Sequence, residues 1–290
     1  MAGAPATARA ALSPVDLAPR PDDPASGVPR TTPNGGVGVT ATVAVFEYHL
    51  VGYRRTWRGS VFGSFLLPLL TMLGFGVGVG AYVEGGVGGV SYLDWVVPGL
   101  IASAALQVGV GEATWPVLGN FEWHKIYFGQ AAAPLRVADV LGGHLAFVVF
   151  RALLSAAAFL LVATLFGAVH SVWALATLPL VVLLGCAVAA PTFAYSASIT
   201  SDSYLALLFR FAVLPMSLFA GVFFPVEAMP VGLRWVAYAT PLWHGVDLCR
   251  AATLGVAPQW SALGHLAYLA LWAVGGWWLA HARFRKRLVF

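Results

Sequence analysis

Long apolar stretches constrain this chain more than any other feature of its sequence. From residue 60 onward, uncharged runs rich in Leu, Val, Ala and Gly alternate with short polar clusters. A run of about 20 such residues crosses a membrane as a helix, which satisfies its own backbone hydrogen bonds there. Hydrophobic residues make up 59% of the chain and charged residues only 10%, whereas a soluble domain carries about 25% charged residues. We therefore predict an all-α integral membrane protein.

The breaks between these runs divide the chain into six predicted spans: about 60–82, 95–117, 140–166, 172–200, 204–224 and 261–281. Together they form one predicted transmembrane domain over 60–282. Residues 225–260 are also apolar, but Pro225, Pro230 and Pro241 divide them into pieces too short to cross the bilayer. We expect an extracellular re-entrant helical hairpin there, before the last span.

The two ends of the chain differ from this domain. Residues 1–40 are rich in proline and lack aromatic side chains, which predicts a disordered cytoplasmic extension. Over 41–59, apolar residues recur every three or four positions while Arg54 and Arg55 occupy other faces. This pattern predicts an amphipathic helix along the inner membrane surface, although a simple extension of the first span is the alternative. Residues 283–290 form a basic tail.

The basic residues indicate the orientation. Most of them fall on segments predicted to be internal, and only Arg234 and Arg250 fall on segments predicted to be external. The positive-inside rule then places both termini in the cytoplasm, which agrees with an even number of spans. The expected location is the bacterial plasma membrane. Because the basic clusters flank hydrophobic helices, we expect lipid contact and no nucleic-acid binding.

Two charged residues are predicted to lie within spans. Glu112 stands near the inner end of the second span, and Arg151 lies about three turns into the third. A charge in a bilayer is costly and is usually paired or functional. If the two helices are neighbours, the residues can form a structural ion pair or a gating element, and the sequence leaves both interpretations open.

Motifs for catalysis are absent from the sequence. It contains no GxxxxGK[ST] phosphate loop, no HExxH, no GxSxG and no paired cysteines. We therefore expect no catalytic, cofactor or metal site in this chain. Any chemical energy for its activity would have to come from another protein.

The segment from 219 to 250 carries a recognisable pattern of glycine, proline, histidine and arginine: Phe219, Gly221, Phe224, Pro225, Met229, Pro230, Pro241, Leu242, His244 and Arg250. It resembles the C-terminal signature of ABC-2 type transporter permeases, the export subunits of ATP-binding-cassette systems, with Met229 where leucine is common. The internal segment with Glu122, Lys125, Pro134, Leu135, Asp139 and Gly142 also resembles the family's loop. The similarity covers about 45–285 and is greatest to nodulation-type lipooligosaccharide and daunorubicin-type drug exporters.

The resemblance implies a half-transporter. Two permease copies would pair and dock two separate ATPase subunits, which would bind ATP and Mg, to export an amphipathic drug, a lipid or a lipid-linked oligosaccharide. Contact with the ATPase is expected at the interface helix and at a coupling loop over 119–139. The aromatic residues of this loop either enter an ATPase groove or only anchor the loop in the membrane interface. The residues expected to make the contact are Arg54, Arg55, Phe121, Glu122, Trp123, Lys125, Tyr127 and Phe128.

The fifth predicted span carries an apolar, largely aromatic face, formed by Phe211, Met216, Phe219, Phe223 and Phe224. Together with the glycine-rich first span, this face would line a seam between two permease copies. Such a face more often contacts lipid or neighbouring helices.

One alternative function is a membrane-embedded lipid enzyme with His144, His244 or Glu112 as acid or base. The other is a channel or secondary transporter, for which the sequence lacks midplane carboxylates and an internal repeat.

Overall fold

The computed structural model describes residues 38–83 and 85–289. The expectation for residues 1–40 therefore lies almost wholly outside the described part of the chain. All regular elements in the described part are helices, as the apolar runs predicted. An isolated β-bridge between Val87 and Val90 closes the turn that precedes the second helix.

Within the described residues, five helical segments are long and apolar enough to cross a membrane. The first candidate span, Phe65–Tyr82, takes in the end of α1 (Gly38–Thr71), a π-helix over Met72–Val79 and a 3-10 turn over Gly80–Tyr82. The others are α2 with α3 (Tyr92–Ala113 and Trp115–Glu122), α5 (Val137–Leu165), a 3-10 turn with α6 (Val172–Ala176 and Thr177–Ser196) and α11 (Ala262–Leu288).

The segment predicted to span over 204–224 is shorter in the structure. It consists of α7 (Ser203–Leu208), a π-helix (Phe209–Val213) and α8 (Leu214–Phe219), a helical stretch that ends at Phe219. The helix stops there because Gly221 adopts a left-handed backbone conformation, with φ of 75°. Residues 220–225 therefore form a turn instead of the last helical turn of a span.

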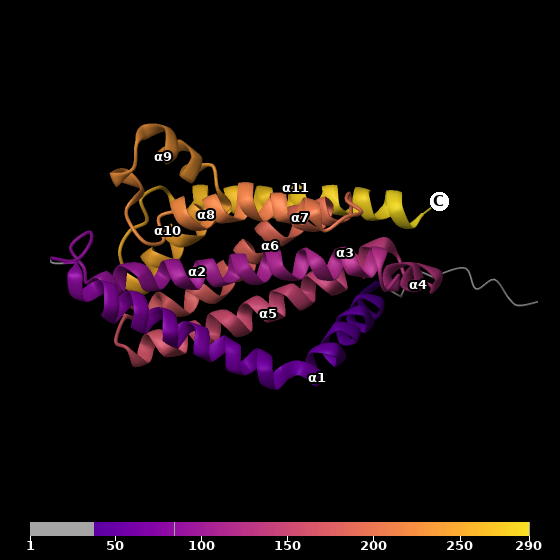
Figure 1. Cartoon of the computed structure of the whole chain (residues 1–290), viewed down its shortest axis with the longest axis horizontal. Coiled ribbons are helices and arrows are strands. Elements are labelled where there is room, and N and C mark those ends of the chain that lie inside the picture. The colour runs from indigo at the N-terminus through magenta and orange to yellow at the C-terminus, as the bar shows by residue number, and fades with distance from the viewer. Residues whose placement is uncertain (1–37, 84, 290) are drawn as a thin grey trace, which may run out of the picture. The chain divides into compact units, whose positions relative to one another are not determined.

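Helix α1 runs without interruption across the predicted boundary between an interface helix and the first span, and it bends along its course (Figure 1). Its buried positions Ala41, Val45 and Tyr53 recur at multiples of four residues and face α5. Val43 and Trp57, which belong to the apolar repeat predicted over 41–59, are about half exposed. The early part of α1 is thus amphipathic, but one of its faces packs on protein.

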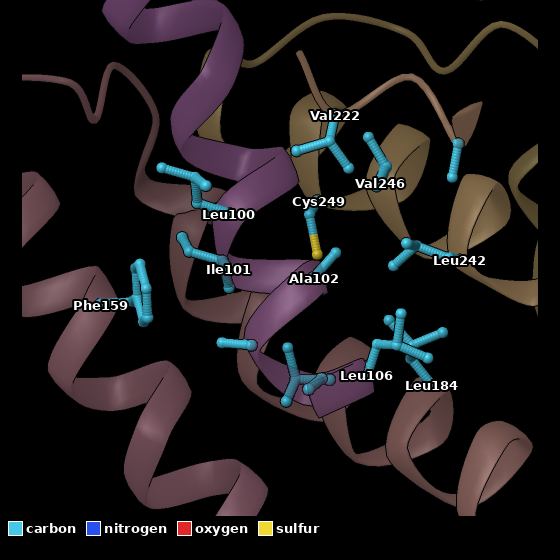
Figure 2. Close-up of a cluster of buried hydrophobic side chains, with 14 of the residues drawn as sticks. Leu100, Ile101, Ala102, Leu106, Phe159, Leu184, Val222, Leu242, Val246 and Cys249 are labelled. Atoms are coloured by element: carbon cyan, nitrogen blue, oxygen red, sulfur yellow. The ribbon is translucent and has the colours of Figure 1, made fainter. Parts of the chain in front are cut away.

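Helix α6 occupies the centre of the packing and contacts α2, α5, α10 (Pro241–Leu254) and α11. Figure 2 shows the largest core cluster, in which α2 contributes Leu100, Ile101 and Leu106. They face Leu184 of α6 and a row of side chains on α10: Leu242, Val246 and Cys249. The proline-rich segment is therefore part of the main core.

Two short helices follow α8. A 3-10 turn (Val226–Ala228) leads into α9 (Val231–Tyr238) and then into α10, and neither helix is long enough to span a membrane. Pro241 is the first residue of α10, where a missing N–H costs nothing. Whereas α10 is almost entirely buried, α9 exposes Val231, Trp235 and Val236.

Two adjacent glycines on α11, Gly275 and Gly276, differ in how closely they approach α6. A Cβ atom at Gly276 would lie 2.5 Å from Pro191 Cδ and 3.0 Å from the Ala190 carbonyl carbon, whereas a Cβ at Gly275 meets nothing within 4 Å. We expect Gly276→Ala to destabilise the protein by about 1–3 kcal/mol through overpacking against α6. Thermal unfolding of the purified protein, followed by intrinsic fluorescence, measures the effect.

Gly275→Ala is the matched control, because it adds the same methyl group one position away in open space. It should leave stability unchanged or raise it by up to about 1 kcal/mol through helix propensity. Equal effects at the two positions would contradict the close contact between α11 and α6.

Candidate functional site

Glu112 and Arg151 form an ion pair between α2 and α5. Arg151 Nη1 donates to Glu112 Oε1 at 2.8 Å, and both side chains are largely but not fully buried. The Arg151 guanidinium also lies over the Tyr53 ring of α1, 5.0 Å from its centroid. The two charges that the sequence placed in neighbouring spans are therefore brought together, and they connect three helices.

The predicted coupling loop is largely helical. After α3, a turn with Lys125 in a left-handed conformation (φ 55°) leads into α4 (Ile126–Ala132), and α5 begins at Val137. Glu122 at the end of α3 accepts a hydrogen bond from Arg287 of α11, and Lys125 Nζ lies 3.7 Å from its other oxygen. Arg287 further donates to the carbonyls of Ala197 and Ile199. This arginine joins α3, α11 and the segment after α6.

Two aromatic residues of this connection do not face outward as expected. Phe121 and Tyr127 are fully buried, and their rings pack on Phe284 of α11 with centroids 5.0 and 5.2 Å away. Large aromatic surfaces are removed from solvent wherever a neighbouring helix can cover them, and α11 does so here. Trp123 is 58% exposed, so it remains available to a partner.

The other residues predicted to contact an ATPase differ in their solvent exposure. Arg54 and Arg55 are exposed on α1, as is Lys125. Glu122 and Phe128 are half-buried, Phe128 beside Phe121. The start of α1, α4 and the end of α11 lie at the same end of the helices (Figure 1). The exposed part of the predicted set therefore consists of Arg54 and Arg55 on α1 and of Trp123 and Lys125 in the turn before α4.

The predicted aromatic face is partly exposed. Phe211 is 77% exposed and Phe224 is 40% exposed, whereas Met216, Phe219 and Phe223 are half-buried. Phe223 packs against Phe75 of the glycine-rich first segment, with ring centroids 4.9 Å apart. Residues from the two segments assigned to a seam thus lie side by side within one chain.

Arg250, the last residue of the motif that runs from Phe219 to Arg250, contacts the backbone near the start of that motif. Its side chain is buried, and Nη2 donates to the carbonyls of Gly221 at 2.8 Å and Trp95 at 3.3 Å. The guanidinium also lies 3.8 Å from the centre of the Trp95 ring. The last residue of the motif therefore holds the left-handed turn at its first glycine against α2.

His244 belongs to a buried chain of polar contacts. Its Nε2 lies 3.0 Å from the carbonyl oxygen of Tyr238, and its Nδ1 lies 2.8 Å from Nδ1 of His265 on α11. His265 Nε2 in turn lies 3.1 Å from Asp247 Oδ2. The Tyr268 ring stacks on His244 with centroids 4.0 Å apart. Both nitrogens of His244 are engaged.

The protons in this chain can be assigned from its partners. The Tyr238 carbonyl only accepts, so His244 Nε2 carries a proton and Nδ1 accepts from His265. Burial, and then the neighbouring His265, lower the pKa of His244 to about 4, so this ring is neutral at neutral pH. The arrangement is a structural clamp between α10 and α11.

Several of these partners were not found from the sequence. Arg287 reads as part of a basic tail, and His265 and Asp247 stand singly in apolar or mixed segments. Each meets its partner through tertiary packing between elements far apart in the chain. Only the proline–leucine–x–histidine spacing signalled His244 in advance.

Comparison with known proteins agrees with this architecture. Residues 40–254 match the family described as ABC-2 type transporter. Nodulation protein J of Rhizobium leguminosarum bv. trifolii is 28% identical over 247 residues, which are 85% of this chain and 94% of that protein. Nodulation protein J of Neorhizobium galegae is 28% identical over 254 residues, 87% of this chain and 95% of that protein. The similarity extends over nearly the whole described region.

The Glu112–Arg151 pair yields a test of structural against gating roles. We expect Glu112→Gln or Arg151→Gln to destabilise the protein on the order of 2 kcal/mol, less than for a fully buried pair because both side chains retain some exposure. The double exchange Glu112→Arg with Arg151→Glu should recover most of the loss. The yield of monodisperse protein and its thermal midpoint measure both effects. Recovered stability with altered transport would instead assign the pair to gating.

Arg250 provides a second test. Arg250→Lys keeps the charge but loses the planar fork that serves two carbonyls and the Trp95 ring, so it should cost about 2 kcal/mol. The same exchange at the half-buried Arg234, which donates to the carbonyls of Glu227 and Met229, should cost less. Thermal unfolding of both variants checks the difference, and comparable losses would rule out a special role for Arg250.

Proposed function

The chain belongs to the ABC-2 type transporter family and is a transmembrane subunit of an ATP-binding-cassette exporter, and from that premise we propose how it works. Two copies pair in the bacterial plasma membrane and dock two separate ATPase subunits. The complex moves an amphipathic drug, a lipid or a lipid-linked oligosaccharide out of the cell. Similarity to nodulation proteins J supports the nodulation-type branch.

The proposed topology has six spans with both termini in the cytoplasm. The helical stretch Ser203–Phe219 acts as the fifth span, and α9 and α10 form a re-entrant hairpin in the outer leaflet. Support comes from the charges, because the exposed Lys125 and Arg285 belong to the turn before α4 and to the end of α11, which lie at the same end of the helices (Figure 1), and the exposed Arg54 and Arg55 precede the first candidate span. The apolar exposed face of α9 suits contact with lipid.

The single observation that carries the coupling proposal is the connection between α3 and α11 at this end. Glu122, Arg287 and the buried rings of Phe121 and Tyr127 fasten the short helices α3 and α4 to the last long helix. A force applied at Trp123 or Lys125 is therefore passed to α11 without a flexible link. Arg54 and Arg55 on α1 offer a second contact for the same partner.

The proposed seam between permease copies runs along the exposed part of the aromatic face. Phe211 and Phe224 supply its outward rings, while the contact between Phe223 and Phe75 joins the fifth segment to the first. An apolar, aromatic lining is better suited to an acyl chain or a flat drug than to a small ion. ATP and Mg would be bound by the partner chains, since this sequence has no phosphate loop.

Affinity purification from native membranes in mild detergent tests the proposal. We expect a partner with a GxxxxGK[ST] motif to co-purify in equal amount with vanadate-sensitive ATP hydrolysis. Trp123→Ala should weaken recovery of the partner about tenfold or more, as truncation of an aromatic anchor does. Trp173→Ala is the matched control, because Trp173 is similarly exposed (71%) but lies at the other end of the spans.

A chain that purifies alone and shows no associated ATPase in any detergent would overturn the exporter proposal and favour a membrane-embedded enzyme. Equal loss of the partner in the two tryptophan variants would contradict the position of the coupling surface.

A further inference from the structure

A cavity of about 490 Å³ lies where α1 passes the end of α2, α3 and the start of α5. Its lining is aromatic and polar: Tyr48, His49, Val51, Gly52, Tyr53, Arg55, Glu112, Pro116, Asn120 and His144. A volume in this range accommodates a small ligand or the headgroup of a larger one. Apart from Arg55, which is also proposed to contact the ATPase, none of these lining residues belongs to the proposed coupling surface.

Three buried polar atoms at this cavity have no hydrogen-bond partner among the described residues: His49 Nε2, Tyr53 Oη and His144 Nε2. All three belong to lining residues, and the imidazole rings of His49 and His144 stack with centroids 4.1 Å apart. Buried polar groups are nearly always hydrogen bonded, so three unpaired polar atoms around one cavity indicate that a binding partner is missing.

His144 offers a donor at its free nitrogen. The Tyr127 hydroxyl lies 2.6 Å from His144 Nδ1, and the Asn120 side chain also hydrogen bonds to that hydroxyl. Burial raises the pKa of Tyr127, so the phenol keeps its proton. With Asn120 donating to the phenol oxygen, Tyr127 donates to Nδ1, and the imidazole proton is therefore on Nε2.

The remaining groups add further donors and positive charge. Burial lowers the pKa of His49 to about 4, so this ring is neutral at neutral pH and carries one N–H. Tyr53 supplies a hydroxyl, and Arg55 supplies a full positive charge. The one carboxylate of the lining, Glu112, is already neutralised by Arg151. The cavity thus presents donors and a net positive charge, which together suit an oxygen-rich anion.

We propose that this cavity binds the phosphate group of an amphiphile in the inner leaflet. The proposal rests on the cytoplasmic orientation proposed above, which brings this end of α1 to the headgroup level of that leaflet. Tyr53, His144 and His49 donate hydrogen bonds to the phosphate oxygens, and Arg55 supplies the opposite charge at the rim. A free phosphate ion has the same chemistry, so the experiment includes both sources.

Binding is measured on the purified full-length chain in maltoside micelles by microscale thermophoresis, without any ATPase. The probes are dioctanoyl phosphatidic acid, the neutral dioctanoylglycerol of the same acyl length, and inorganic phosphate. The variants are Tyr53→Phe, which removes only the orphan hydroxyl, and Arg55→Gln. Arg58→Gln is the matched control, because Arg58 carries the same charge on α1 but does not line the cavity.

We expect saturable binding of phosphatidic acid, little binding of dioctanoylglycerol, and a loss of affinity of about tenfold in Tyr53→Phe and Arg55→Gln. Arg58→Gln should stay within about twofold, since an exposed charge outside the site contributes little. Binding of inorganic phosphate with the same variant pattern would support the site and assign it a soluble ligand.

Equal losses in Arg55→Gln and Arg58→Gln would show general attraction to a basic helix and overturn the proposal. Unchanged affinity in Tyr53→Phe, or no saturable binding of any phosphate probe, would overturn it as well and leave the cavity to water. Because no ATPase takes part, these outcomes are independent of whether the exporter proposal succeeds.

Discussion

Close approach of helix backbones at small residues is the constraint on which the rest of this structure depends. Gly109 of α2 faces Gly185 and Val188 of α6, and Gly276 of α11 faces Pro191 of the same helix. In a bilayer, burial of apolar surface gives helices little reason to associate, so packing distance decides which of them pair. With α6 held between α2 and α11, α10, which begins at Pro241, can pack on the same core through Leu242 and Val246.

Polar interactions then lock the two ends of this bundle. At one end Arg287 joins Glu122 to the carbonyls that follow α6. At the other end Arg250 holds the turn at Gly221, and the chain from Asp247 through His265 to His244 holds α10 against α11. Because α11 takes part at both ends, it is suited to carry a displacement from one side of the membrane to the other.

This arrangement bears on the competing functions. A histidine used as a general base needs a free nitrogen near its substrate, and both nitrogens of His244 are already engaged. Glu112 is engaged by Arg151. His244 and Glu112, two of the three residues considered as acids or bases from the sequence, therefore serve mainly to join helices.

The sequence by itself determined the helical class, the membrane location and the approximate bounds of most long helices. The reason is that an apolar run of about 20 residues can satisfy all of its backbone hydrogen bonds within lipid by forming a helix. The predicted span 172–200 corresponds to Val172–Ser196, and 140–166 to Val137–Leu165. It also identified the motif from Gly221 to Arg250, and it raised the pairing of Glu112 with Arg151 as a possibility that depended on their helices being neighbours.

Tertiary structure alone decided which polar side chains have partners. Phe121 and Tyr127 lie in a polar segment where aromatic residues were predicted to contact an ATPase or the membrane interface. In the structure, the ring of Phe284, far along the chain, covers both of them. His49 and His144 stack, and His244 finds His265, only because particular helix faces meet. Periodicity along one helix shows which residues share a face, but it does not show which face of another helix will lie opposite. For that reason the cavity beside α1 could not be read from the sequence.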